Sequence, residues 1–277
     1  MFATAVIVFR EVFEAALLIG IVAAATQSVP GRNRWLVAGI AAGLLGSALV
    51  AASTSAIAEM ASGLGQEIFN ASVLGFAVLM LAWHNVWMAS HGAALSAGAR
   101  AIGGAIRDGQ RECSVLFLVV GLAVLREGAE TVLFLYGIST AGDGGSLGML
   151  VGGLIGTGAG VATGYAVYAG LLRIPLRRLF TATGALVLLL AAGMASQAAR
   201  FLIQADLLPS LASPLWDASS LLPQRSLFGA LLHSLVGYED RPAGMQLVFY
   251  LAAMASIAIA MNWASKVQSI NKTREAQ

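Results

Sequence analysis

Seven long apolar segments occupy most of this chain, and they leave few folds open to it. A membrane-spanning helix needs about 20 mostly apolar residues, and in lipid only helices and closed barrels satisfy the backbone. Only 11% of the residues are charged, against about 25% in a soluble domain. We therefore predict an all-α polytopic membrane protein, a single membrane domain over residues 1–277 with seven transmembrane helices. The segments are 2–27, 35–58, 68–90, 114–139, 147–172, 179–203 and 245–264.

The first apolar segment differs from a signal peptide, and we expect it to be kept as the first membrane helix. A signal peptide begins with a basic stretch and continues with an uninterrupted apolar region. Here Arg10, Glu11 and Glu14 interrupt the apolar region, and no basic stretch precedes it. The single cysteine, Cys113, excludes an internal disulfide and a cysteine-rich zinc or copper site.

The distribution of basic residues predicts the orientation of the chain. Cytoplasmic connections of membrane proteins are enriched in Lys and Arg. The first, third and fifth connections and the C-terminal tail carry most of these residues, so we expect them in the cytoplasm and the N-terminus outside. The membrane would be the plasma membrane, which is the inner membrane in a bacterium. The residues are Arg32, Arg34, Arg100, Arg107, Arg111, Arg173, Arg177, Arg178, Lys266, Lys272 and Arg274.

The connections predicted to be external are acidic, with seven carboxylates and three arginines. Such an excess would concentrate cations at the mouth of a pathway, although ordinary solvated loops have the same composition. The longest external connection, residues 204–244, is expected to hold short helices on the external face. Its Asp217 could contact an arriving cation or cap a short helix, and Glu59 and Glu67 are further candidate external ligands. The seven acids are Glu59, Glu67, Asp143, Asp206, Asp217, Glu239 and Asp240.

Two copies of one three-helix pattern account for the first six segments. When Arg10 is aligned with Arg126, small residues recur every four positions in the second and fifth segments, a pattern that lets helices approach closely. Residues 1–90 and 114–203 thus form two repeats, followed by the segment 245–264. With three spans each, the copies must have opposite orientations, as in the inverted repeats of secondary transporters. The matched residues are Gly39, Gly43, Ser47 and Ala51 with Gly152, Gly156, Gly160 and Gly164; the second series fits a contact within one bundle or between protomers.

Both repeats carry the string R-E-x-x-E inside an apolar segment, at residues 10–14 and 126–130. An ionisable group at the bilayer centre costs about 2.5–3.5 kcal/mol on the insertion scale and usually marks a functional site. Glutamates three positions apart share a helix face, so two packed helices would gather four carboxylates. Such a group requires protons or a bound cation, and carboxylates suit hard cations such as iron, manganese, calcium and magnesium. The four carboxylates are Glu11, Glu14, Glu127 and Glu130.

Arg10 and Arg126 directly precede these glutamates. Because adjacent residues do not share a helix face, we expect each arginine to pair with a neighbouring helix or with the opposite repeat. A purely structural alternative is a set of buried Arg–Glu bridges that tie helices together. Buried ion pairs stabilise poorly compared with apolar packing, and the excess of acid over base favours a cation site.

Paired R-E-x-x-E strings in the first and fourth of seven spans resemble the oxidase-dependent iron permeases. These include the fungal high-affinity iron permease and the membrane subunit of bacterial Efe-type iron uptake systems. The segment from Asp217 to Leu221 is similar to the D-A-S motif of that family, and the resemblance covers essentially the whole chain. It implies high-affinity iron uptake, with Glu11, Glu14, Glu127 and Glu130 as ligands of iron in transit.

The resemblance also implies an external or periplasmic partner that oxidises or delivers the iron. Fungal members carry an external E-x-x-E, whereas Glu59 and Glu67 here are eight positions apart, so a hand-off site of the fungal kind is not expected. The other expected partners are the iron ion and the lipid bilayer. We expect no resident cofactor and no nucleic acid.

His84 is a further candidate at membrane depth. Met80, His84 and Met88 recur every four residues, which fits core packing as well as a soft-metal stripe. His84 could also relay protons from a position behind the glutamates.

Two other functional classes compete with an iron permease. A proton-coupled transporter of manganese, lead or a small organic cation would use the same carboxylates. An intramembrane enzyme is disfavoured, because the sequence has no H-E-x-x-H or G-x-S-x-G motif. We therefore expect a permease and not an enzyme.

Overall fold

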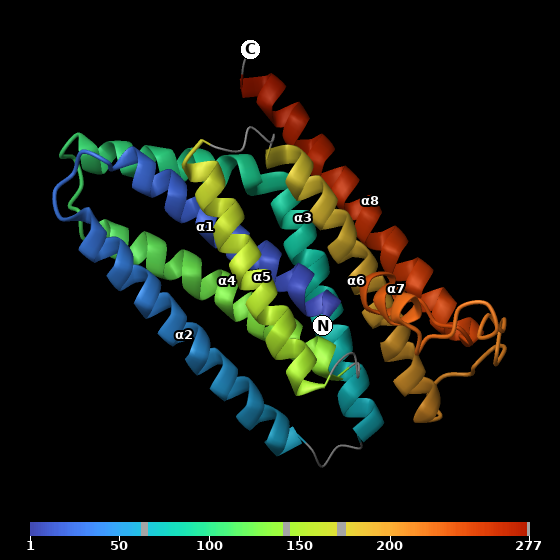
Figure 1. Ribbon diagram of the computed structural model, residues 1–277. Coiled ribbons are helices and arrows are strands. Elements are labelled where there is room, and N and C mark those ends of the chain that lie inside the picture. Colours follow the sequence, from blue (N-terminus) through green and yellow to red (C-terminus); the bar gives the residue numbers. More distant parts are fainter. Residues whose placement is uncertain (62–65, 141–144, 171–175, 276–277) are drawn as a thin grey trace.

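The computed structural model describes residues 1–61, 66–140, 145–170 and 176–275, and these residues form eight α-helices and no β-strand (Figure 1). The prediction of an all-α fold is confirmed for this part of the chain. Each of the seven apolar segments overlaps one long helix, and a short helix lies within the connection 204–244. The helices are α1 (Phe2–Ala25), α2 (Arg32–Ala61), α3 (Gln66–Arg107), α4 (Val115–Thr140), α5 (Ser146–Tyr168), α6 (Leu176–Gln204), α7 (Leu227–Val236) and α8 (Gly244–Glu275).

Five of these helices are long and apolar enough to cross a membrane by length and composition alone. The segments are Arg32–Thr54, Gln66–Met88, Ser146–Tyr168, Thr181–Gln204 and Gly244–Ala264. Helices α1 and α4 have 24 and 26 residues, which is also sufficient for a span. Each of them carries the three charged residues of an R-E-x-x-E string, so its place in a bilayer depends on what surrounds those charges.

Helix α3 extends well beyond the segment expected to end at residue 90. It has 42 residues and continues to Arg107, so the prediction that Arg100 and Arg107 lie in a loop was wrong. Figure 1 shows the second half of α3 turning away from the first half and running past the C-terminal end of α1. A Cβ atom on Gly103 would lie 2.4 Å from Cβ of Ala25. This close contact with α1 gives the extension a packing surface.

Small residues bring two pairs of helices into close contact, α5 with α1 and α2 with α4. A Cβ atom on Gly156 would lie 2.6 Å from the carbonyl oxygen of Ala5, and one on Gly43 would lie 2.8 Å from that of Gly121. Contacts advance along both chains in the same direction, so each pair is parallel. The glycine series of α5 therefore packs within the protein, against α1. Its members are Gly152, Gly156, Gly160 and Gly164.

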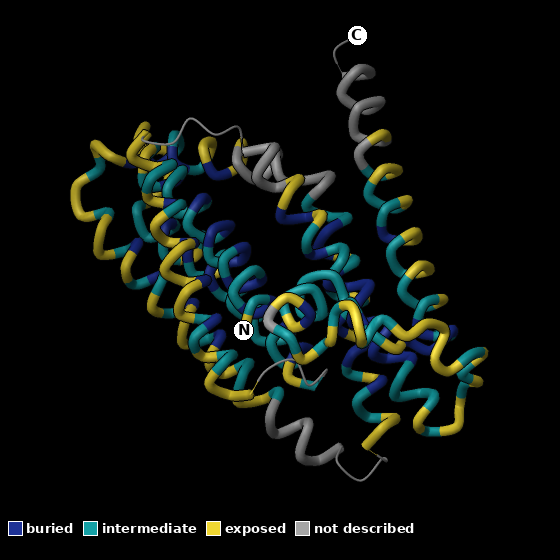
Figure 2. Tube along the Cα trace, turned by 45° about the vertical axis from the view of Figure 1, so that its right-hand side comes forward, coloured by how far each residue is buried: buried dark blue, intermediate teal, exposed yellow. Residues whose placement is uncertain are grey.

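Two clusters of buried apolar side chains lie at opposite ends of the antiparallel helices α1 and α4. The first apolar cluster includes Ala3, Ile7, Leu74, Ala77, Leu81, Phe134, Ile138, Val187, Leu190, Ala191, Met194, Ala198 and Ile257. The second apolar cluster includes Val22, Leu36, Ala99, Ile106, Leu116, Val120 and Val124. Figure 2 shows buried residues recurring along the helices, interleaved with exposed ones. Both R-E-x-x-E strings lie between the two clusters along their helices.

The contact of α5 with α1 can be tested with two alanine substitutions three positions apart. Gly156→Ala should lower the thermal unfolding midpoint of the purified protein in detergent, because overpacking costs about 1–3 kcal/mol. Gly153→Ala is the matched control, since a Cβ atom there meets nothing within 4 Å and alanine favours the helix. Equal midpoints for the two variants would contradict the close packing of α5 on α1.

Candidate metal site

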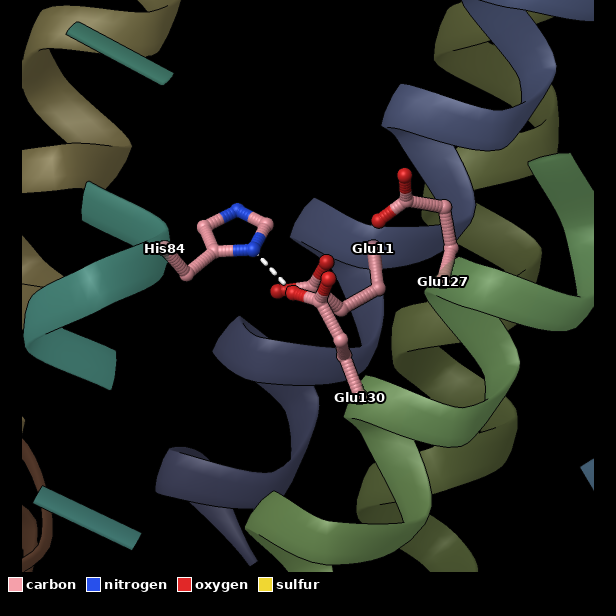
Figure 3. A group of neighbouring side chains, drawn as sticks. All are labelled: Glu11, His84, Glu127 and Glu130. Atoms are coloured by element: carbon pink, nitrogen blue, oxygen red, sulfur yellow. Dashed lines mark hydrogen bonds and ion pairs between the residues drawn. The ribbon is translucent and has the colours of Figure 1, made fainter. Parts of the chain in front are cut away.

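The two R-E-x-x-E strings meet between α1 and α4, and His84 of α3 points toward them (Figure 3). One ligand atom each from Glu11, His84, Glu127 and Glu130 lies within 4.8 Å of the others. Glu14 lies on the other side of the imidazole, with its Oε2 3.6 Å from Nε2 of His84. The structure thus brings all four predicted glutamates together, three directly and the fourth through His84.

This group is buried, and several of its oxygen atoms have no hydrogen-bond partner. Glu11 is 1% exposed, and Glu14 and Glu127 are 4% exposed. Among the described residues, neither carboxylate oxygen of Glu11 has a hydrogen-bond partner, nor does Oε2 of Glu127. A buried polar atom without a partner costs about 1–3 kcal/mol, and more when it is charged. Oxygens held in this way are suited to binding a cation.

Each arginine pairs with a glutamate of its own string. Nε of Arg10 donates to Oε1 of Glu14 over 3.0 Å, and Nε of Arg126 donates to Oε1 of Glu130 over 3.1 Å. The prediction that the arginines pair with other helices or with the opposite repeat was therefore wrong. Residues i and i+4 share a helix face, so the arginine of each string pairs with the last glutamate of the same string.

The two arginines differ in their surroundings. The side chain of Arg10 is 3% exposed, whereas that of Arg126 is 36% exposed. The guanidinium carbon of Arg126 lies 4.1 Å from the ring centroid of Trp87, close enough for a cation–π interaction. The pair in α1 is therefore enclosed, whereas the pair in α4 lies at the edge of the site.

His84 contacts a glutamate from each string. Its Nδ1 forms a hydrogen bond with Oε2 of Glu130, and its Nε2 faces Glu14. The ring is buried, and its edge packs on Phe134 with 6.3 Å between the centroids. The sequence suggested a place behind the glutamates, but the imidazole lies among them. Imidazole nitrogen is a common metal ligand, so His84 adds a nitrogen to an oxygen-rich group.

Two cavities reach this site from the side of the second apolar cluster. One of about 570 Å³ includes Glu11 and Glu127 and extends to Arg32 and Tyr168. The other, of about 460 Å³, includes Arg126 and Glu127 and extends along the second half of α3. Glu127 lines both cavities and is therefore the carboxylate through which they meet the site.

Buried apolar side chains cover the opposite side of the site. Ile7 lies one helical turn before Glu11, and Phe134 lies one turn after Glu130. Both side chains are 0% exposed and belong to the first apolar cluster. An ion could not pass this layer without a rearrangement, because it would lose its hydration without gaining ligands.

The proposed external ligands are not part of the group. Asp217 lies in the connection after α6, where it accepts hydrogen bonds from the backbone and hydroxyl of Ser219 and pairs with Arg241 at 2.9 Å. The Ser219 hydroxyl and then the Arg241 guanidinium lower the pKa of Asp217 to about 2. Glu67 is exposed in the first turn of α3, and the side chain of Glu59 lies outside the described residues.

The difference between the two arginines leads to a test. Arg10→Gln should destabilise the protein strongly, because removing one partner of a buried ion pair costs about 3–5 kcal/mol. Arg126→Gln should cost less, because its guanidinium is partly open to a cavity. Thermal unfolding of both variants in the same detergent measures this order, and a larger loss for Arg126→Gln would contradict it.

Comparison with known proteins identifies the family of the chain. Residues 1–267 match the iron permease FTR1 family. The ferrous iron permease EfeU of Escherichia coli O157:H7 is 28% identical over 94% of this chain and 96% of its own. EfeU of Yersinia pestis is 28% identical over 90% of this chain and 89% of its own, and no solved structure matches. The family match spans nearly the whole chain, which confirms the resemblance seen in the sequence: this multi-pass membrane protein belongs to the iron permease FTR1 family.

Proposed function

We propose that the protein carries iron inward across the plasma membrane, the inner membrane in a bacterium, through the site of four glutamates and His84. The observation that carries this proposal is the convergence of two R-E-x-x-E strings on one buried group with unpartnered carboxylate oxygens. Carboxylate and imidazole ligands suit iron. Relatives of similar length are described as ferrous iron permeases, and we therefore propose the ferrous ion as the substrate.

The charge of the site favours a divalent ion. The four carboxylates are accompanied by two guanidinium groups, so these side chains together carry a formal charge of −2. A divalent cation would neutralise this charge, and a buried excess charge is costly unless it is paired. In the proposal, Glu11 and Glu127 bind the ion first, because their oxygens are not committed to the arginines by hydrogen bonds.

We further propose seven spans, with α1–α3 and α4–α6 as inverted repeats and α8 as the seventh. The parallel packing of α5 on α1 and of α2 on α4 supports this arrangement, because the second helix of each repeat packs on the first helix of the other. The equivalent pairs Arg10–Glu14 and Arg126–Glu130, and the antiparallel course of α1 and α4, support it as well. Such repeats place substrate sites at their interface near the membrane midplane.

The proposed orientation gives the two sides of the site different roles. With the N-terminus outside, the first apolar cluster lies toward the exterior and both cavities at Glu127 lie toward the cytoplasm. The present arrangement then corresponds to a form from which iron is released inward. Transport by alternating access requires Ile7 and Phe134 to separate when the site opens outward. An external delivery or oxidising protein, with Asp217, Glu59 and Glu67 as first contacts of the ion, remains a prediction.

The proposed site can be tested by uptake of radioactive ferrous iron into iron-starved cells. Glu14→Gln and Glu130→Gln should each reduce uptake by about 10-fold to 100-fold, because hydrogen bonds and contacts of charged groups contribute about 1.5–3 kcal/mol. Glu112→Gln is the control, since Glu112 is an exposed acid outside the site. Unchanged uptake in both site variants, at equal protein levels, would refute the site.

The identity of the metal can be tested by competition. The same cells should take up ferrous iron in preference to manganese or lead at equal concentration. Ascorbate should preserve this preference, because it keeps the iron in the ferrous state. Uptake of manganese or lead without uptake of iron would instead identify a transporter of another cation.

A further inference from the structure

The imidazole of His84 reaches the four-glutamate site from a different helix than the carboxylates do. The carboxylates belong to the R-E-x-x-E strings of α1 and α4, whereas His84 lies on α3. Helix α3 packs on α6 and α8 as well as on α1 and α4. Figure 3 shows the ring entering the group from the side of α3. Whatever holds this turn of α3 in place therefore decides where the imidazole lies.

The residue after His84 forms a buried hydrogen bond to another helix. Nδ2 of Asn85 donates to the backbone carbonyl oxygen of Gly184, on α6, over 3.3 Å. Asn85 is 2% exposed, as is His84. A buried amide that loses its acceptor is costly, because water cannot replace the lost partner. The side chain of Asn85 is thus a polar tie between α3 and α6 inside the protein.

The surroundings of Asn85 hold its side chain closely. A Cβ atom on Gly184 would lie 3.6 Å from Oδ1 of Asn85 and 4.0 Å from Cε of Met261, on α8. One turn before Asn85, Leu81 is 0% exposed and belongs to the first apolar cluster together with Val187 of α6. The hydrogen bond therefore continues an apolar contact between α3 and α6.

His84 and Asn85 together determine how α3 is rotated about its axis. Adjacent positions on a helix point roughly 100° apart, so the two side chains face different neighbours. The imidazole contacts Glu14 and Glu130, whereas the amide contacts α6. A rotation of α3 that released the amide would also move the imidazole relative to both carboxylates.

We propose that Asn85 is a positioning residue for the metal site. By tying α3 to α6, it holds the imidazole of His84 where the ring binds the ion together with the glutamates. Asn85 acts through His84 and does not itself bind the ion. The proposal rests on the proposed transport of iron through this site. It adds a determinant of metal selectivity that lies outside the group of ligands.

The imidazole nitrogen affects which cation the site prefers. Carboxylate oxygens suit manganese, whereas imidazole suits iron, and affinity generally rises from Mn²⁺ to Fe²⁺. A site that loses the nitrogen and keeps its carboxylates is therefore less selective for ferrous iron over manganese. Displacement of His84 by a change at Asn85 should have the same effect as removal of the imidazole.

The test measures ferrous iron uptake and its inhibition by Mn²⁺ in iron-starved cells, with ascorbate present. The selectivity ratio is the Mn²⁺ concentration that halves uptake, at iron well below KM, divided by the KM for iron. His84→Ala and Asn85→Leu should each lower this ratio about tenfold, because groups that orient a metal-binding histidine have effects of this size. A smaller amount of folded protein lowers the maximal rate but not the ratio. An unchanged ratio in Asn85→Leu, with a lowered ratio in His84→Ala, overturns the proposal.

A double variant separates positioning of His84 from a general effect on packing. In His84→Ala no imidazole remains to be positioned. Adding Asn85→Leu should then change the ratio by less than about twofold, because effects that act through one residue are not additive. A further tenfold fall would show that Asn85 acts on the site without His84 and would overturn the proposal.

Two more variants control for the substitution itself. Asn70→Leu makes the same change on α3 at an exposed hydrogen bond, where Oδ1 of Asn70 accepts from Gln66 over 3.1 Å. Its ratio should stay within about twofold, as is usual for surface substitutions, and a fall equal to that in Asn85→Leu overturns the proposal. If Asn85→Leu is absent from the membrane, Asn85→Ala removes the same hydrogen bond without adding an apolar branch. An unchanged ratio in Asn85→Ala also overturns the proposal.

Failure of the proposed transport would look different from failure of this inference. Absence of iron uptake by the unaltered protein would refute the transport itself. An unchanged ratio in His84→Ala would remove His84 from the proposed ligands and the positioning role with it. A lowered ratio in His84→Ala with an unchanged ratio in the Asn85 variants would refute the positioning role alone.

Discussion

The buried layer of charge between α1 and α4 is the constraint on which the rest of the structure depends. Four carboxylates and the Arg10 guanidinium lie inside a bundle made mainly of apolar helices, and the Arg126 guanidinium lies at the edge of this group. Each R-E-x-x-E string reduces the free-energy cost of burying these charges within one helical turn, because its arginine reaches the glutamate four positions ahead. In surroundings of low dielectric constant such contacts are stronger than in water. The acids that remain without a hydrogen-bonded base are the ones available to an ion.

Close helix packing places the two strings against each other. The small residues of α5 and α2 allow these helices to lie against α1 and α4, and each crossing involves backbone atoms that a larger side chain would displace. The apolar clusters at the two ends then isolate the charged layer. The first cluster covers the site with Ile7 and Phe134, whereas cavities reach Glu127 beside the second. Among the described residues, the site is thus open to cavities beside the second apolar cluster and covered beside the first.

The buried polar group of Glu239, Gln197 and Gln246 resembles the central site on a smaller scale. In both places a buried carboxylate is held by donors, and a neighbouring oxygen lacks a hydrogen-bond partner. The first apolar cluster, which includes Ala3 and Ile138, separates the two places.

The sequence by itself determined the helical class, the approximate places of the long helices and the four glutamates, because apolar length and misplaced charge are local properties of the chain. It also pointed to His84, but not to the contacts of that ring with Glu14 and Glu130, which depend on how α3 lies against α1 and α4. The partners of the arginines were predicted wrongly, because each arginine shares a helix face with the glutamate four positions ahead and pairs with it there. The extension of α3 beyond residue 90 and the hydrogen bonds of Glu239 with Gln197 and Gln246 join residues far apart in the chain. Only the tertiary structure decided them, because packing between distant segments selects among conformations that the local sequence allows.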